Sequence, residues 1–213
     1  MKASTSIQFS RDPATIGGSG LPRENADFYP TPASSTEMLL PYLPPPGGGK
    51  VWEPAAGNGA IVKILQRAAY SVVASDLYDR GAGYRSGVDF LAVKKLPKHV
   101  TCIVTNPPYS KETGTAFVRH ALRLFEESES EVGFVAMFVR AEFLFAKNRR
   151  DLFVRPDFDG ALFVGRPRWF ADTTTSPRFE FCWLTWAVGV SNGQHAIRFG
   201  SKKPTFALDQ TAI

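Results

Sequence analysis

Apolar positions between residues 50 and 190 follow two kinds of spacing. Short apolar runs, typical of buried strands, occur at 50–54, 72–77, 100–105, 132–139, 161–164 and 179–190. Apolar residues that recur every three or four positions predict helices at 60–70, 116–127 and 142–153. Because strands alternate with helices, we predict an α/β fold in which helices cover both faces of a mostly parallel sheet. No helix is predicted between the last two strands, so the sheet should end in an antiparallel hairpin.

The same pattern divides the chain into three parts. Residues 1–26 are polar and rich in glycine, without periodicity, and we expect them to form a flexible arm. Residues 27–192 contain all the alternating segments and are predicted to form one domain, which suits a chain of 213 residues. Residues 193–213 are then a C-terminal tail.

Composition narrows the class of protein. Hydrophobic residues make up 44% of the chain and charged residues 21%, which supports a packed core and argues against global disorder. No stretch approaches the roughly 18 apolar residues that cross a bilayer, and the N-terminus lacks the apolar region of a secretory signal. Cys102 and Cys182 are too few for a disulfide framework or a structural zinc site. We therefore expect a reduced, cytoplasmic setting, no membrane and no metal.

Positive charge is concentrated in one part of the chain. The net charge is +5, and between residues 147 and 178 seven Lys and Arg residues stand against four Asp residues. A one-sided basic segment of this kind attracts a phosphate backbone. We therefore predict that residues 141–178 form an insertion that contacts nucleic acid. The basic residues expected to make these contacts are Arg149, Arg150, Arg166 and Arg168.

A glycine-rich turn follows the first strand segment directly. Residues 53–59 read EPAAGNG, and Gly57 and Gly59 allow a tight turn where a ligand can approach the backbone. A dinucleotide-binding fingerprint needs another glycine at position 62, where the chain has Val62. The turn therefore suits a nucleoside ligand without a pyrophosphate, and Glu53 suits a ligand that carries an ammonium group. Taken alone, such a turn can equally be a plain strand–helix connection.

An acidic residue follows the second strand. Asp76 lies 17 residues after Gly59, where its carboxylate can accept hydrogen bonds from ribose hydroxyl groups. In open parallel sheets, ligands bind at the carboxyl ends of the strands, so this acid and the glycine turn should lie close together.

A proline-rich loop follows the strand at 100–105. The sequence Asn106-Pro107-Pro108-Tyr109 holds Asn106 in a restricted, extended geometry, since each proline limits the residue before it. Asn106 Oδ1 and the Pro107 carbonyl can both accept hydrogen bonds from one exocyclic amino group, while Tyr109 stacks on the attached ring. A rigid connecting loop or a polyproline ligand is the structural alternative.

In this order, the three motifs resemble those of the class I S-adenosylmethionine-dependent methyltransferases. They are most similar to the enzymes that methylate adenine N6 in DNA, and the segment DFYPTP at 27–32 strengthens the likeness. The segments GRPRWF at 165–170 and FCWLTW at 181–186 are similar to those of short phage- and prophage-type enzymes. The resemblance implies a Rossmann-like methyltransferase domain over residues 27–192, with a mostly parallel seven-stranded sheet.

The resemblance also implies roles for individual residues. Asp76 would bind the ribose, and Asp89 and Phe90 the adenine of the cofactor, although Asp89 can instead cap a helix that starts near Phe90. Trp169 or Phe170 would form a second wall of the base pocket, or else belong to the core. The residues implied to bind S-adenosylmethionine are Tyr29, Pro30, Thr31, Glu53, Gly57, Gly59, Asp76, Leu77, Asp89, Phe90 and Asn106. Those implied to act in catalysis are Asn106, Pro107, Pro108 and Tyr109.

The implied activity is site-specific methylation of adenine N6 in double-stranded DNA, on a base flipped out of the helix. Such an enzyme needs neither a metal nor a covalent nucleophile, and it would work in the bacterial cytoplasm, at the nucleoid or in a phage-infected cell. Methylation of cytosine N4, of adenine in RNA or of a protein glutamine amide shares the loop and stays open. A DNA-binding module with a decayed cofactor site is the non-enzymatic alternative.

Overall fold

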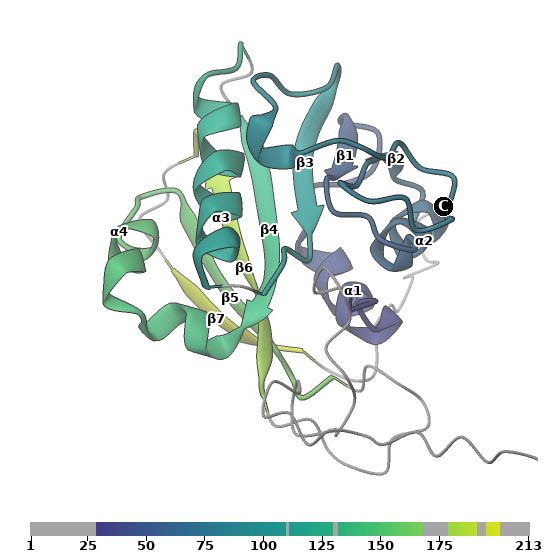
Figure 1. The fold of residues 1–213 in the computed structure, drawn as a ribbon. Helices are drawn as coiled ribbons and strands as arrows, with labels where there is room; N and C mark the ends of the chain where they lie inside the picture. Colours follow the sequence, from purple (N-terminus) through teal and green to yellow (C-terminus); the bar gives the residue numbers. More distant parts are fainter. Residues whose placement is uncertain (1–28, 110, 130–131, 168–178, 191–194, 201–213) are drawn as a thin grey trace, which may run out of the picture.

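The structure is a computed structural model that describes residues 29–109, 111–129, 132–167, 179–190 and 195–200. Within these residues, seven strands form one sheet in the order β2-β1-β3-β4-β6-β5-β7 (Figure 1). The strands are β1 (Lys50–Glu53), β2 (Ser71–Ala74), β3 (Val100–Thr105), β4 (Gly133–Arg140), β5 (Phe158–Gly165), β6 (Phe181–Val188) and β7 (Ala196–Phe199). The α-helices are α1 (Ala33–Leu39), α2 (Ala60–Arg67), α3 (Lys111–Glu126) and α4 (Arg150–Phe153).

Strand direction divides the sheet into two parts. Strands β2, β1, β3 and β4 are paired in parallel. Strand β6 lies antiparallel between β4 and β5, and β7 pairs in parallel with β5 at the sheet edge. The predicted α/β fold, with a mostly parallel seven-stranded sheet and a C-terminal antiparallel hairpin, is confirmed.

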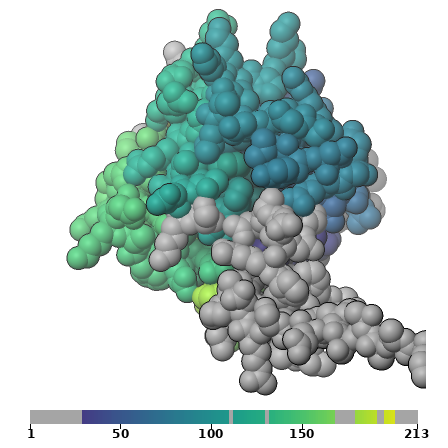
Figure 2. All heavy atoms as spheres, viewed as in Figure 1, coloured from purple at the N-terminus to yellow at the C-terminus, as the bar shows by residue number. Residues whose placement is uncertain are grey.

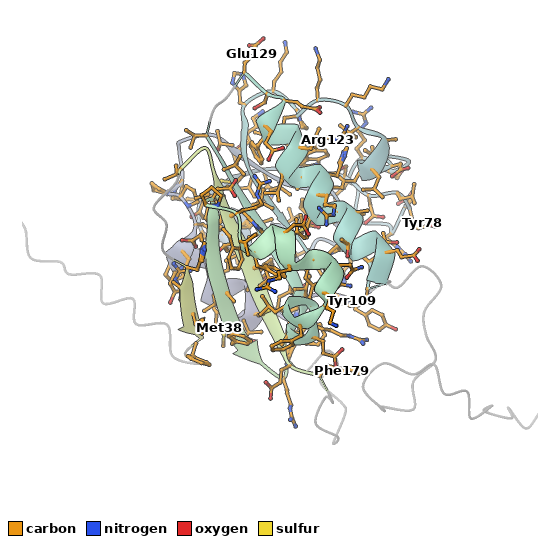
Figure 3. All side chains as sticks on the ribbon, turned by 90° about the vertical axis from the view of Figure 1, so that its left-hand side faces the viewer. Met38, Tyr78, Tyr109, Arg123, Glu129 and Phe179 are labelled. Carbon is orange, nitrogen blue, oxygen red and sulfur yellow. The ribbon has the colours of Figure 1, made fainter. Side chains whose placement is uncertain are left out.

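The core has two layers, one on each face of the sheet. Successive side chains of a strand point to opposite faces, so a strand covered on both sides must be apolar throughout. In β4, Phe134 and Phe138 pack in the cluster that contains Leu65 of α2, whereas Val135 and Met137 pack in the cluster that contains residues of α3. Helix α3 therefore covers one face and α1 with α2 the other, and Figure 3 shows side chains filling the space between α3 and the sheet. Drawn as spheres, the described residues form one continuous body (Figure 2).

The prediction of one helix over 142–153 is wrong. The chain forms 3-10 turns at Ala141–Phe145 and Lys147–Arg149 before the short helix α4. Ala146, between the two turns, has an extended backbone with ψ of 124°. Tertiary contacts hold this irregular path, because Phe143, Arg149 and Leu152 are buried while side chains between them, such as Phe145 and Lys147, are exposed.

Strand β7 lies within the residues that we assigned to a C-terminal tail, so the sheet continues past the predicted end of the domain. Ala196 is opposite Gly160 and Phe199 opposite Phe163 in the parallel pairing with β5. The strand is only 4 residues long, too short for a clear hydrophobic pattern, and its Ile197 and Phe199 side chains are exposed. Among the described residues, no helix is long and apolar enough to cross a membrane.

Gly160 sets how closely β5 and β7 approach. Its φ is +148°, and a Cβ there would collide with the backbone of Ala196. We expect Gly160→Ala to lower the free energy of unfolding by roughly 3 kcal/mol, from backbone strain and lost strand pairing. Gly165→Ala is the matched control, because Gly165 has φ +77° but open space around it, so only a cost of about 1 kcal/mol is expected. If urea denaturation gave the same loss of unfolding free energy for Gly160→Ala and Gly165→Ala, the role given to the Ala196 contact would be contradicted.

Candidate functional site

A pocket of about 220 Å³ lies beside the carboxyl ends of β1, β2 and β3. Parallel strands end at the same edge of a sheet, so the three motifs that follow these strands converge there. Of the residues predicted to bind a cofactor, all except Gly59 line this pocket. They are Tyr29, Pro30, Thr31, Glu53, Gly57, Asp76, Leu77, Asp89, Phe90 and Asn106.

Glu53 is the most deeply buried charged group of the pocket. Its side chain is 1% exposed, and Oε1 accepts hydrogen bonds from the Thr105 hydroxyl and from the Ala55 amide at 3.0 Å. Oε2 is buried and has no hydrogen-bond partner among the described residues. Burial raises the pKa of Glu53 from 4.5 to about 8, and the nearby Asp76 carboxylate adds to the shift. An open carboxyl oxygen in this position can pair with a cationic group of a ligand.

A second pair of contacts joins the glycine turn to Asp76. The Gly57 amide donates to Asp76 Oδ2 at 2.8 Å, and the Tyr78 amide donates to Oδ1 at 2.8 Å. The carboxylate is therefore held in place at the pocket wall. Gly59 does not line the pocket but begins helix α2 with φ +80°, where a Cβ would collide with the Tyr84 phenol ring.

Asp89 and Phe90 lie at the far end of the same pocket. Asp89 Oδ1 accepts a hydrogen bond of 3.0 Å from the Leu91 amide and caps the 3-10 turn Phe90–Ala92. The capping alternative is thus observed, and Asp89 nevertheless lines the pocket. Phe90 is buried, with its ring centroid 5.2 Å from that of Trp52 and 4.7 Å from that of Phe117. It forms an apolar floor that a flat ring can contact.

The Asn106 side chain is oriented by a residue distant in the sequence. Its Nδ2 donates to the Tyr29 carbonyl at 3.1 Å. Its Oδ1 is buried and accepts no hydrogen bond from any residue that the structure describes. An unsatisfied buried acceptor is costly unless a ligand supplies the donor. The structure therefore presents one acceptor at this loop to an incoming donor.

A second pocket, of about 460 Å³, lies on the other side of the proline-rich loop. Pro107, Pro108 and Tyr109 line it together with residues from β4 and the two 3-10 turns that follow. Pro108 also lines the first pocket, so this loop is the wall between the two. Arg140, at the end of the buried strand β4, also lines this pocket and was not among the predicted site residues. Its guanidinium lies 4.0 Å from the Phe179 ring centroid and 5.7 Å from that of Tyr109.

The residues predicted to contact nucleic acid have different surroundings. Arg149 is only 6% exposed, and its guanidinium donates to Thr115 Oγ1 at 2.9 Å and to the Phe143 carbonyl at 3.3 Å. Burial lowers the pKa of Arg149. Arg149 also lines the second pocket, so its contact with nucleic acid stays a prediction. Arg150 is exposed, and Arg166 is exposed beside Glu180 at 3.5 Å. The remaining predicted residues, Arg168, Trp169 and Phe170, lie outside the described residues.

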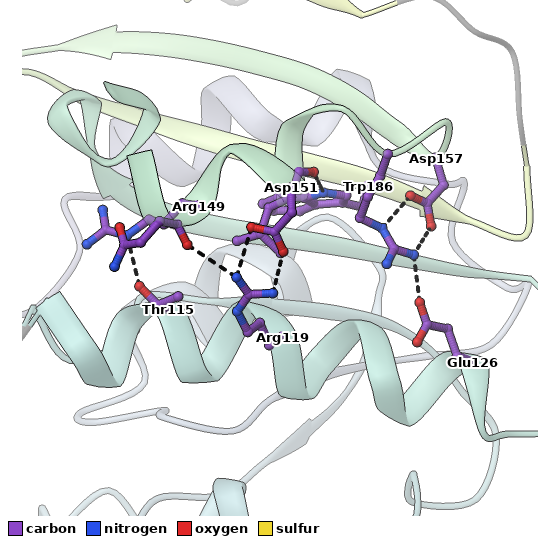
Figure 4. A network of polar contacts seen from close by, with 10 residues as sticks. Thr115, Arg119, Glu126, Arg149, Asp151, Asp157 and Trp186 are labelled. Atoms are coloured by element: carbon purple, nitrogen blue, oxygen red, sulfur yellow. Dashed lines mark hydrogen bonds and ion pairs between the residues drawn. The ribbon is translucent and has the colours of Figure 1, made fainter. Parts of the chain in front are cut away.

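Much of the positive charge in this segment is used within the fold (Figure 4). Arg155 forms ion pairs with Asp157 at 2.7 Å and Glu126 at 2.6 Å. Arg119 of α3 donates to Asp151 at 2.9 Å and to the Asn148 carbonyl at 3.3 Å. These contacts fasten the segment to α3. Within the described part of the chain, no group of three or more His, Cys, Asp or Glu side chains is arranged to hold a metal ion.

No protein-family model and no curated protein matches this sequence. Solved structures do match its fold. The type I restriction-modification methyltransferase subunit from Streptococcus thermophilus has a TM-score of 0.59 and 14% identity, over 85% of this chain and 51% of that chain. A candidate class I S-adenosylmethionine-dependent methyltransferase from Listeria monocytogenes has a TM-score of 0.53 and 13% identity, over 79% of this chain and 64% of that chain. A candidate RNA methyltransferase from Pyrococcus horikoshii has a TM-score of 0.56 and 14% identity, over 78% of this chain and 89% of that chain.

These likenesses show that the chain has the class I methyltransferase fold. The chain spans about half the length of the S. thermophilus subunit, whereas it spans most of the P. horikoshii protein.

The raised pKa of Glu53 makes stability depend on pH. The pKa of Glu53 is about 8 in the folded chain and 4.5 as the ordinary value of the unfolded chain. Between these two values the folded chain keeps a proton on Glu53 that the unfolded chain has released. This contribution to the free energy of unfolding is therefore complete below pH 4.5 and declines between pH 4.5 and 8, by up to about 1.4 kcal/mol per pH unit. We expect the stability difference between the wild type and Glu53→Gln to change over this range in urea denaturation. A difference that is constant from pH 5 to 8 would contradict the prediction.

Proposed function

We propose that this protein transfers a methyl group from S-adenosylmethionine to the N6 amino group of adenine in double-stranded DNA. One observation carries the proposal. The buried, unsatisfied Asn106 Oδ1 belongs to a loop that separates two pockets. A methyl transfer to an amino group needs an acceptor for that group at the boundary between the donor site and the acceptor site, and Asn106 is suited to this task.

The first pocket fits the chemical groups of S-adenosylmethionine. Glu53 has an open, buried oxygen for the ammonium group, and Asp76 has a fixed carboxylate for the ribose hydroxyls. Phe90 and Asp89 offer an apolar face and a carboxylate to the adenine ring. When bound, this cofactor supplies an electrophilic methyl group, while the protein supplies binding and orientation.

The proline-rich loop would act on the substrate amino group. The lone pair of this nitrogen is delocalised into the base, which makes it a poor nucleophile. Hydrogen bonds to Asn106 Oδ1 and the Pro107 carbonyl favour a more tetrahedral nitrogen and return electron density to it. The Tyr109 ring centroid lies 5.9 Å from that of Tyr29 and 5.7 Å from that of Phe181. Held by these two rings, Tyr109 offers a stacking surface for the base. Fixed alignment of this kind can supply a large part of the rate enhancement.

DNA is the substrate that we propose for the second pocket. A base in a duplex must leave the stack to reach it, and stacking on Tyr109 would offset part of that cost. The fold shared with a restriction-modification methyltransferase subunit supports this choice. We extend the proposal to the short phage- and prophage-type enzymes of the bacterial cytoplasm, because of the motifs at 165–170 and 181–186.

The direct test is transfer of labelled methyl from S-adenosylmethionine to unmethylated duplex DNA, followed by analysis of the nucleosides. We expect N6-methyladenine from the wild-type protein. Asn106→Ala removes the side-chain acceptor and should lower kcat at least about 100-fold, since an acceptor used in the transition state is lost.

Asn106→Ser is the matched variant, because it keeps a side-chain oxygen and should retain more activity than Asn106→Ala. Label in N4-methylcytosine, in RNA or in a protein amide would overturn the proposed substrate. Equal activity of Asn106→Ala and the wild type would overturn the proposed role of the loop.

Binding of S-adenosylmethionine should also depend on pH through Glu53. The ammonium group pairs best with the ionised carboxylate, and the pKa of this carboxyl is about 8 in the folded protein. We therefore expect affinity to rise by up to about tenfold per pH unit between pH 6 and 8 in titration calorimetry. Glu53→Gln should bind more weakly, with little dependence on pH over the same range. Parallel pH profiles in both proteins would exclude this pairing.

A further inference from the structure

An aromatic side chain at the second pocket is left open to solvent. Phe145 is 81% exposed, and among the described large apolar side chains none is more exposed. It lines the pocket that also contains Tyr109. Leaving a phenylalanine in water forgoes the free energy of burying its ring, which a partner that covers the ring can recover.

The turn that carries Phe145 is firmly anchored. Phe143, two residues earlier, is buried, and its carbonyl accepts a hydrogen bond from the buried Arg149. Arg149 is tied to Thr115 of α3, and the neighbouring Asn148 carbonyl accepts from Arg119 (Figure 4). Phe145 is therefore presented on a braced turn, and a rigid group loses less conformational entropy on binding.

The charges near Phe145 favour a polyanionic partner. Lys147 and Arg150 are both exposed on the same segment, whereas Asp151 is paired with Arg119. Glu142, which is also exposed, is the acidic residue of this pocket. An exposed ring beside exposed cations is suited to stack on bases while the cations contact phosphates.

We propose that Phe145 is a wedge that enters the base stack of the duplex at the position that the target base leaves. The proposal rests on the proposed function and identifies how that site opens its substrate. Removing a base from the stack costs a few kcal/mol. Apolar side chains inserted between base steps stabilise such distorted DNA, and stacking of one ring on a base contributes about 1–3 kcal/mol. Phe145 assists the reaction by positioning and does not contact the transferred methyl group.

The test compares Phe145→Ala with Phe199→Ala, because Phe199 is 78% exposed on strand β7 and serves as a matched control. Each variant is assayed on two duplexes. The first is a fully paired duplex that the wild type methylates, and the second has the same sequence but leaves the target adenine unpaired. Phe145→Ala should lower kcat/KM on the paired duplex by roughly 5- to 150-fold, as a loss of about 1–3 kcal/mol implies. The loss on the unpaired substrate should be under about threefold, and Phe145→Trp should restore most of the activity.

Base flipping is measured separately with 2-aminopurine at the target position. Its fluorescence should rise on binding of the wild type and of Phe199→Ala, and much less with Phe145→Ala. Equal losses on paired and unpaired substrates, or no loss on either, would overturn the wedge while leaving the proposed function intact. If the wild type methylates neither substrate, the proposed function itself fails, and the wedge fails with it.

Discussion

The hydrogen bond between the Thr105 hydroxyl and Glu53 joins the ends of β3 and β1, and the site is built around it. It holds a carboxyl group in a nearly water-free position, where burial keeps its pKa high and leaves its second oxygen open. Asn106 and the proline-rich loop begin at the residue after Thr105. One contact between strand ends therefore fixes the distance between the two motifs that form the candidate cofactor and substrate sites.

The proline-rich loop separates two pockets whose linings differ in chemistry. The first pocket combines the buried Glu53 carboxyl group and the half-buried Asp76 carboxylate with an aromatic floor, which suits a ligand with an ammonium group, a ribose and a flat ring. The second pocket is aromatic and lies under a segment braced against α3. Because Pro108 belongs to both walls, the two pockets adjoin each other at this loop, and Asn106 lies on the side of the first pocket.

Some of the basic residues after β4 make contacts within the protein, although their sequence alone suggests a charged surface. A run of arginines has the same appearance whether the guanidinium groups lie in solvent or inside the protein. Here Arg149 is buried and braces the turn, while Arg155 neutralises two carboxylates. These arginines therefore hold in place the segment on which Phe145, Lys147 and Arg150 are exposed.

Local patterning was enough to predict the segments of β1 to β6 and the α/β class, and the edge that parallel strands share was enough to predict that the motifs after β1, β2 and β3 lie together. The burial of Arg149, the exposure of Phe145 and the pairing of β7 with β5 became visible only in the folded chain. The tertiary structure also decided the orientation of Asn106, whose partner Tyr29 is 77 residues away in the chain. Each of these features depends on contacts between distant segments, which no local pattern of hydrophobic and polar residues encodes.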